Sequence, residues 1–333
     1  MRRILFDVME INIAVGPVIF LLSILAEKLR KKYGTQWLKA VWVLLAARLL
    51  FPYNFSLPNT RLRLFNTPGF GQEGRMAENN GFLYSDILLY IWLVGAAIYA
   101  ACHLLVYIHL HKVFRYHLKM VRNADLQRQL AIMQEKYLGK VRFPVYESGL
   151  VKGPLLTGLV RPKLIIPSDK RWEDQELELI IAHEICHYKK KDLWLKLMVL
   201  CAGCINWFNP AFYLMKKQFY FDMELVCDQY AIGDGSELRR KNYARALLAF
   251  AGRERRGSAF TAGFSAADKL LKRRIHYMWE DGKRKRGVSV FLFVLVLVSG
   301  IGLSVSCGYK PQELPRNFQC QWRVTSVRTA VSD

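Results

Sequence analysis

The chain has 333 residues, of which 52% are apolar, and its 49 Lys and Arg against 27 Asp and Glu give a formal net charge of +22 at pH 7. This hydrophobicity excludes an intrinsically disordered chain, and its combination with a strongly basic balance is unusual for a cytosolic enzyme. The seven Cys are scattered without even spacing, which excludes a small disulfide-stabilised scaffold.

Four apolar segments predict transmembrane helices. They cover about residues 4–26, 37–51, 82–110 and 288–306, and each approaches the roughly 20 helical residues that cross a bilayer core of about 30 Å. The second is the shortest and carries Lys39 and Arg48, whose long side chains can reach the membrane surface. The sequence therefore predicts a membrane domain over 1–110 with three helices, and a fourth helix at 288–306.

The positions of Lys and Arg predict the orientation of these helices. Lys28, Arg30, Lys31 and Lys32 lie between the first two segments, whereas the loop 52–81 holds three Lys and Arg in thirty residues. Cytoplasmic loops carry an excess of these residues. We therefore expect a multi-pass protein of the plasma membrane in which 111–287 is cytoplasmic, while the N-terminus, the loop 52–81 and the tail 307–333 are extracytoplasmic.

Most of the excess charge lies in the expected cytoplasmic part. Residues 109–287 hold 34 Lys and Arg against 19 Asp and Glu. A basic surface beside anionic lipid accounts for this balance, and no fold signature of a nucleic-acid-binding protein accompanies it. Membrane lipid is therefore an expected partner, and direct binding of nucleic acid is not expected.

Helices and short strands alternate through this part of the chain. We expect helices over 112–140, 236–251 and 266–280, and three strands at 142–146, 155–159 and 163–166, which Gly and Pro separate. The apolar run 193–215 is interrupted at Asn209 and Pro210, so each half is too short to cross a membrane. It predicts two helices, packed in the domain core or dipping into the cytoplasmic leaflet.

The spacing within HEICH at 183–187 predicts a metal site. His183 and His187 are four residues apart, so on a helix both imidazoles lie on one face and can bind a single Zn²⁺. Glu184 would then face a water on the open coordination position as a general base. Apolar Leu177 and Ile181 in the preceding segment support the helix. The alternative is a helix that carries two surface histidines.

Catalytic zinc needs a third protein ligand. Glu224 and Asp228 share a helical face, so Glu224 is the candidate ligand and Asp228 a candidate acceptor for the N–H of a ligand histidine. Asp222 is an alternative ligand, and Glu224 could instead be a solvated charge. Asp192, five residues after His187, could support that histidine or be an ordinary surface carboxylate. The spacing of the remaining histidines does not suit a metal ligand; these are His103, His109, His111, His117 and His276.

With these motifs in place, the chain resembles the BlaR/MecR-type antirepressor metallopeptidases, integral-membrane gluzincins of metallopeptidase family 56. The resemblance covers about residues 1–306. It depends on GPLLTGLVRPKLIIP at 153–167, HEICHYKKKD at 183–192, WFNP at 207–210, ELVCDQYAI at 224–232 and LKRRI at 271–275.

The resemblance implies both a fold and a set of site residues. The fold would be a mainly α integral membrane protein, with four transmembrane helices and a cytoplasmic α+β zinc-peptidase domain over 111–287, between the third and fourth helices. The site would hold one Zn²⁺ per chain on His183, His187 and Glu224, with Glu184 as catalytic base.

The chain departs from the antibiotic-sensing members after the fourth apolar segment. Those members carry a large penicillin-binding domain with a Ser-x-x-Lys motif, whereas residues 307–333 contain no such motif. We therefore do not expect β-lactam sensing by this chain. A signal would have to come through the loop 52–81, an extracellular sensor partner or the membrane itself.

The leading hypothesis is a membrane-anchored zinc endopeptidase that cleaves a cytoplasmic protein at a specific site. The resemblance implies a DNA-binding transcriptional repressor, the chain itself, or both as substrates, with 253–268 as a hypothetical self-cleavage region. A strand beside the metal could bind substrate as an added strand, or could be purely structural. Tyr230, Arg274 and His276 are candidates for stabilising the oxyanion, and a homodimer is compatible with the sequence.

The alternative to a zinc endopeptidase is a non-proteolytic zinc-binding signalling scaffold. A transporter is disfavoured because the acidic and His residues cluster outside the apolar segments.

Overall fold

The computed structural model describes residues 2–52, 78–170, 172–233, 235–256, 266–280 and 285–306. Side chains are described over somewhat less, because those of 2–3, 78–85, 253–256, 266–267 and 300–306 are not placed. The tail 307–333, nearly all of the loop 52–81 and the middle of the hypothetical self-cleavage region lie outside the described residues.

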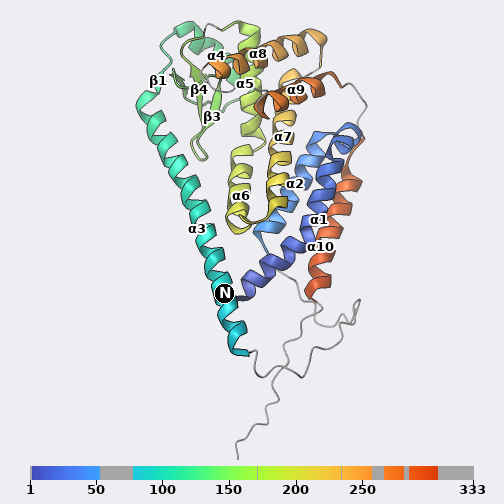
Figure 1. The fold of residues 1–333 in the computed structure, drawn as a ribbon. Helices are drawn as coiled ribbons and strands as arrows, with labels where there is room; N and C mark the ends of the chain where they lie inside the picture. The colour runs from blue at the N-terminus through green and yellow to red at the C-terminus, as the bar shows by residue number, and fades with distance from the viewer. Residues whose placement is uncertain are drawn as a thin grey trace, which may run out of the picture.

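Four long or apolar helices form one end of the molecule. They are α1 (Arg2–Tyr33), α2 (Thr35–Leu50), α3 (Glu78–His117) and α10 (Val288–Ser306). The starts of α1 and α3 and the ends of α2 and α10 lie toward the same end of the molecule, and the small sheet lies at the opposite end (Figure 1). Successive helices therefore alternate in direction, as they would if each crossed a membrane.

Two described helices are long and apolar enough to cross a membrane, judged by length and composition. They are the stretches Ile4–Tyr33 of α1 and Asp86–His117 of α3. Helix α2 has 16 residues and so spans only about 24 Å, and the apolar part Val288–Ser299 of α10 is shorter still. The mainly α fold is confirmed, α1 and α3 are candidate spans, and the crossing of a membrane by four helices stays a prediction.

The apolar run at 193–215 forms a helical hairpin, as its Asn-Pro break predicts. Helix α6 (Asp192–Ile205) is followed by α7 (Pro210–Ile232), and the side chain of Asn209 accepts a hydrogen bond from the N–H of Ala211 at 2.8 Å. This is the N-cap arrangement that Asn favours, with Pro at the first helical position. The hairpin lies alongside α1 and α2 (Figure 1), and all of these helices share the largest apolar core with α10.

Polar contacts hold the tip of the hairpin against α1 and α2. The amide of Asn12 donates to Asn206 Oδ1 at 2.7 Å, Asn209 donates to the side chain of Asn12, and Asn206 donates to the carbonyl of Leu49 at 3.1 Å. All three asparagines are buried. Buried amides need such partners, so these bonds determine how the hairpin sits against the two helices.

Helix α3 contacts the hairpin through a small set of residues and leaves most of its apolar surface exposed. Trp92 Nε1 donates to the carbonyl of Ile205 at 2.9 Å, and Trp207 Nε1 donates to the carbonyl of Trp92 at 3.2 Å. Gly95 lets the Trp207 ring approach, because a Cβ at position 95 would lie 2.2 Å from it. The spanning window of α3 has none of its residues buried, which suits a helix that faces lipid.

A four-stranded mixed sheet lies beyond these helices, with the strand order β1-β2-β4-β3. The strands are β1 (Lys119–Met120), β2 (Val145–Ser148), β3 (Leu155–Thr157) and β4 (Lys163–Pro167). β2 and β4 are parallel, while β1 and β3 are antiparallel to their neighbours. β3 therefore forms an edge of the sheet, and Leu156 is paired in register with Leu164.

Four further helices surround the sheet and the end of the hairpin: α4 (Ala124–Leu138), α5 (Asp174–Lys189), α8 (Glu237–Arg256) and α9 (Ala266–Trp279). The last two match the expected helices at 236–251 and 266–280. The single helix expected at 112–140 is wrong, because α3 ends at His117 and strand β1 precedes α4. Asn123 caps α4 by accepting from the N–H groups of Asp125 and Leu126, which fixes its start.

Candidate metal centre

Helix α5 positions the two histidines of the HEICH segment. His183 and His187 are 6% and 7% exposed, and their ring centroids lie 4.9 Å apart. Leu177, Ile181 and Ile185 on another face of α5 pack into the core beneath the sheet. Because apolar residues anchor that face, the two imidazoles are directed toward α7.

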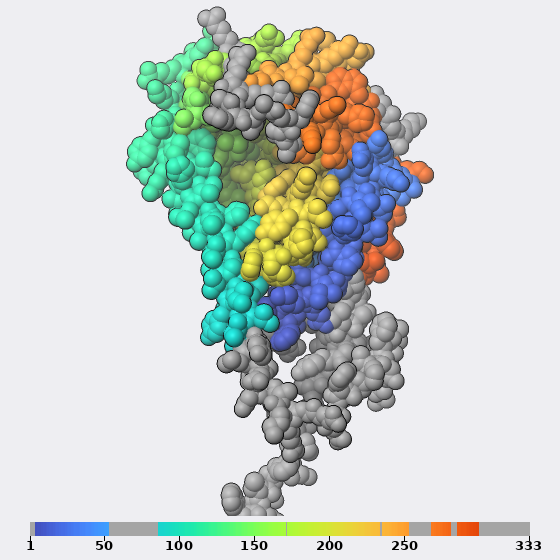
Figure 2. Space-filling view, in the orientation of Figure 1, coloured from blue at the N-terminus to red at the C-terminus, as the bar shows by residue number. Residues whose placement is uncertain are grey.

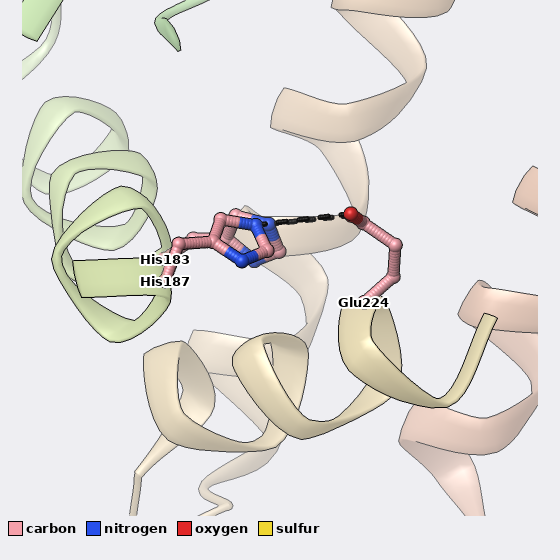
Figure 3. Close-up of side chains that lie close together, drawn as sticks. All are labelled: His183, His187 and Glu224. Carbon is pink, nitrogen blue, oxygen red and sulfur yellow. Dashed lines mark ion pairs between the residues drawn. The ribbon is translucent and has the colours of Figure 1, made fainter. Parts of the chain in front are cut away.

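Helix α7 presents a carboxylate to these imidazoles. Glu224 Oε2 lies 3.5 Å from His183 Nε2, and Glu224 Oε1 lies 3.7 Å from His187 Nε2. Figure 3 shows the two imidazoles pointing across the gap between the helices at this carboxylate. One donor atom from each of the three residues lies within 4.8 Å of the others. Two imidazole nitrogens and one carboxylate oxygen are the ligand set of many catalytic zinc sites, so these residues fit the ion.

A buried carboxylate and a phenol hold the other nitrogen of His183. Its Nδ1 lies 2.8 Å from the hydroxyl of Tyr243 on α8 and 3.3 Å from Asp228 Oδ1 on α7. The Tyr243 hydroxyl also donates to Asp228 Oδ1 at 2.7 Å. Arg274 on α9 donates to both oxygens of Asp228, and its Nη1 lies 3.1 Å from Glu224 Oε2. These bonds orient the ring so that Nε2 remains directed at Glu224.

Asp192 holds His187 in a similar way. Its Oδ2 lies 2.8 Å from His187 Nδ1, and its Oδ1 accepts a hydrogen bond from the ammonium group of Lys39 on α2. Cys227 Sγ also lies 3.4 Å from His187 Nδ1. Lys191, with φ of 54°, is the one non-glycine residue with a positive φ in the described part of the chain. That left-handed turn brings Asp192 back beneath His187.

The charges around the histidines favour a cation. Burial lowers the pKa of His183, but hydrogen bonds and charge from Asp228 and Glu224 outweigh it and raise that pKa to about 10. Burial raises the pKa of Asp228, yet Arg274 and His183 bring it down to about 2. The pKa of Glu224 is also below its usual range, because His183 and Arg274 outweigh its burial. Asp228 and Glu224 thus stabilise a positive charge at His183. Since an imidazole must lose its proton to bind a metal, a metal cation would take the place of that proton.

Glu184 contacts the edge of the sheet. Its Oε2 accepts a hydrogen bond from the N–H of Leu156 on β3 at 2.9 Å. Because this N–H bonds to Glu184, it faces away from β4 and lies along the free edge of the strand. The candidate general base and the edge strand are therefore in direct contact.

An open groove of about 590 Å³ adjoins this edge. Leu156 and Leu159 line one side of it, and His187, Leu193 and Trp194 line the other. Figure 2 shows this face of the molecule hollowed where the end of α5 meets α6, between α3 and α7. His187 of the candidate metal centre thus lines an open groove beside the edge strand.

The structure shows which of the alternative ligand and oxyanion candidates lie near the histidines. Asp222 lies away from the histidines, where it accepts from Arg30 Nε at 2.5 Å and from Trp42 Nε1 at 2.8 Å. Tyr230 accepts instead from Lys189 at 2.9 Å, and His276 is exposed beside Glu280. Arg274 does lie at the site, bound to its carboxylates.

Two residues at the site escaped the sequence analysis. Tyr243 is the buried aromatic of α8 whose hydroxyl contacts His183, and Lys39 is a charge within a predicted transmembrane segment. The sequence did contain a signal for Lys39, because a charged residue in an apolar segment is energetically costly unless it has a partner of opposite charge.

Comparison with known proteins identifies the family of the chain. Residues 6–278 match the family model described as BlaR1 peptidase M56, and the chain belongs to this peptidase family. It is 26% identical over 188 residues to "Regulatory protein BlaR1" of Bacillus licheniformis, which covers 56% of this chain and 31% of that protein. It is 27% identical over 194 residues to "Methicillin resistance mecR1 protein" of Staphylococcus aureus, covering 54% and 32%. The chain therefore aligns with about a third of the length of these relatives.

Proposed function

We propose that the chain is a membrane-anchored zinc endopeptidase that cleaves a cytoplasmic protein at a specific site during transmembrane signalling. The observation that carries this proposal is the convergence of His183, His187 and Glu224 beside Glu184, with both histidines held from behind by carboxylates. Membership of a peptidase family and similarity to proteins named for regulation and resistance support it. A DNA-binding repressor, the chain itself, or both are the proposed substrates.

His183, His187 and Glu224 would hold one zinc ion per chain, with Asp228 and Asp192 orienting the two histidines. When bound, the ion would supply a Lewis acid for the scissile carbonyl and would lower the pKa of a nearby water. Glu184 would accept the proton of the attacking water and return it to the leaving amine nitrogen as the C–N bond breaks. Its contact with the N–H of Leu156 at 2.9 Å supports this role, because it holds the carboxylate at the edge strand.

The edge strand supports a mode of substrate binding. An extended peptide could add to the edge of β3, where it would accept from the outward N–H of Leu156 that now donates to Glu184. Its scissile bond would then lie beside Glu184, and a neighbouring side chain could enter the groove lined by Leu159, Leu193 and Trp194.

The placement in the membrane is part of the same proposal. We propose four transmembrane helices, a cytoplasmic peptidase domain over 111–287 and extracytoplasmic termini. The alternating directions of α1, α2, α3 and α10 support this topology (Figure 1). Anionic lipid would contact the basic cytoplasmic surface, and an extracytoplasmic sensor protein or a second copy of the chain are further candidate partners.

Substitution of the candidate base tests the activity. We expect the parent chain in detergent and its Glu184→Gln variant to bind about one zinc each, with cleavage of a repressor from the same genome slowed about 10²–10⁴-fold in the variant. Glu178→Gln is the matched control, because Glu178 lies on the same helix but bonds to Lys136 and Tyr137. It should cleave like the parent.

The outcomes separate the proposal from its alternative. If the parent and both variants bind zinc and cleavage persists in Glu184→Gln, the assigned base is wrong. If the parent binds zinc and no repressor or self-cleavage fragment appears, a zinc-binding signalling scaffold becomes the better description. A parent that binds no zinc contradicts both.

A further inference from the structure

A buried ion pair joins a predicted transmembrane helix to the candidate metal centre. The side chain of Lys39 is 8% exposed, that of Asp192 is 0% exposed, and the Lys39 ammonium donates to Asp192 Oδ1. Lys39 belongs to α2 and Asp192 begins α6, so 153 residues separate them along the chain. A buried charge of this kind needs a partner of opposite sign.

The same carboxylate contacts a candidate zinc ligand. While Asp192 Oδ1 is bound to Lys39, Asp192 Oδ2 lies 2.8 Å from His187 Nδ1. Both oxygens are therefore occupied, which leaves the carboxylate one orientation. Lys191 supports this arrangement, because a lysine remains in a left-handed conformation only where its surroundings require it.

Helix α2 also contacts the segment that carries the third candidate ligand. Trp42, one helical turn after Lys39, donates through Nε1 to Asp222 Oδ2 at 2.8 Å. Asp222 lies on α7 two residues before Glu224. A displacement of α2 would therefore act on both the start of α6, beneath His187, and the part of α7 that presents Glu224.

We propose that Lys39 is a positioning residue of the metal centre, which acts through Asp192 on His187, and that α2 thereby couples the membrane helices to the metal affinity of the site. The inference rests on the proposed zinc-binding function. It assigns a route by which a signal received in the membrane would change the enzyme: movement of α2 releases the Asp192 carboxylate, His187 loses its orientation, and zinc is held less tightly. Loss of an outer partner of a ligand histidine typically weakens metal binding about 10–100-fold.

The test measures metal binding by the full chain in detergent. We expect Lys39→Met to raise the Kd for zinc at least about 10-fold in chelator competition, and to change the visible absorption of the Co²⁺-loaded protein, which reports ligand geometry. Lys39→Arg keeps a cation on α2 and should recover part of the affinity.

Two comparisons separate positioning from general destabilisation. Leu45→Ala removes a fully buried side chain from the same helix without touching Asp192; it should lower the melting temperature and leave the zinc Kd within about twofold. In an Asp192→Asn background, Lys39→Met should add little further loss, because both changes act through the same carboxylate.

The results divide clearly. The coupling is overturned if Lys39→Met leaves the zinc Kd unchanged, or if Leu45→Ala changes it equally. It is also overturned if the effects of Lys39→Met and Asp192→Asn on the Kd multiply independently. Each of these results leaves zinc binding itself intact. Failure of the parent itself to bind zinc or Co²⁺ would overturn the proposed function and this inference together.

Discussion

The Tyr243 hydroxyl bridges His183 Nδ1 and Asp228 Oδ1. We expect Tyr243→Phe to weaken zinc binding about 10-fold, because His183 keeps Asp228 but loses the bond of 2.8 Å that fixes its ring. The free energy of unfolding should fall by about 1–2 kcal/mol, since Asp228 loses a buried donor. Chelator competition and thermal unfolding measure the two effects.

Tyr277→Phe is the control for this change. Tyr277 is also buried, on α9, where its ring packs against Phe221. Its loss of a hydroxyl should leave the zinc Kd unchanged. Equal zinc affinities in the parent and Tyr243→Phe would show that Asp228 alone orients His183.

The site residues that sequence reasoning could find are those that lie near one another along the chain. His183 and His187, and likewise Glu224 and Asp228, are four residues apart, and helical periodicity alone places each pair on one face. Tyr243 and Lys39 reach the site from α8 and α2. No periodicity in the sequence links Tyr243 and Lys39 to the site, because their positions depend on how whole helices pack.

At the level of elements, the contact between α3 and the hairpin depends on a glycine. We expect Gly95→Ala to lower the free energy of unfolding by about 1–3 kcal/mol, because the new Cβ would lie 2.2 Å from the Trp207 ring. The ring cannot move freely, since Trp207 Nε1 is bound to the carbonyl of Trp92. Thermal unfolding in detergent measures the change.

Gly16→Ala in α1 is the matched substitution, since nothing lies within 4 Å of a Cβ there. It should leave stability unchanged or raise it by up to about 1 kcal/mol, because Ala favours the helix. If both variants melt together, α3 does not depend on this contact.

Element boundaries show where the sequence was informative and where it was not. The hairpin was predictable because Asn209 and Pro210 combine a cap with a residue that suits the first helical turn. The helix expected at 112–140 failed because α3 ends at His117 and β1 (Lys119–Met120) separates it from α4. The signal that was missed is Asn123, whose side chain starts a new helix at α4.

For the whole molecule, the proposed topology makes a prediction about access. Thr60→Cys lies in the loop 52–81 and should react with a membrane-impermeant maleimide in intact cells. Arg128→Cys, on the exposed surface of α4, should react only after the cells are permeabilised. The parent chain serves as the background for its native cysteines, and the reverse labelling pattern would contradict the orientation derived from Lys and Arg.

Apolar composition predicted α1, α2, α3 and α10, but not how three of them share a core with α6 and α7. The largest apolar cluster joins α1, α2 and α10 to α6 and α7. A hydrophobicity pattern reports that a helix has an apolar face, without identifying the helix that covers it. The partition into a membrane domain over 1–110 and a peptidase domain over 111–287 stays a prediction, and the shared cluster shows that the two parts pack against each other.

The turn at Lys191 has a consequence for how the family segment HEICHYKKKD can vary. Each helical residue rotates the chain by about 100°, so deleting or inserting one residue between His187 and Asp192 would swing the start of α6 away from the histidine it now supports. Replacing the three consecutive lysines with other polar residues would preserve that alignment. The length of this connection, rather than its charge, is what keeps α5 and the hairpin of α6 and α7 in register.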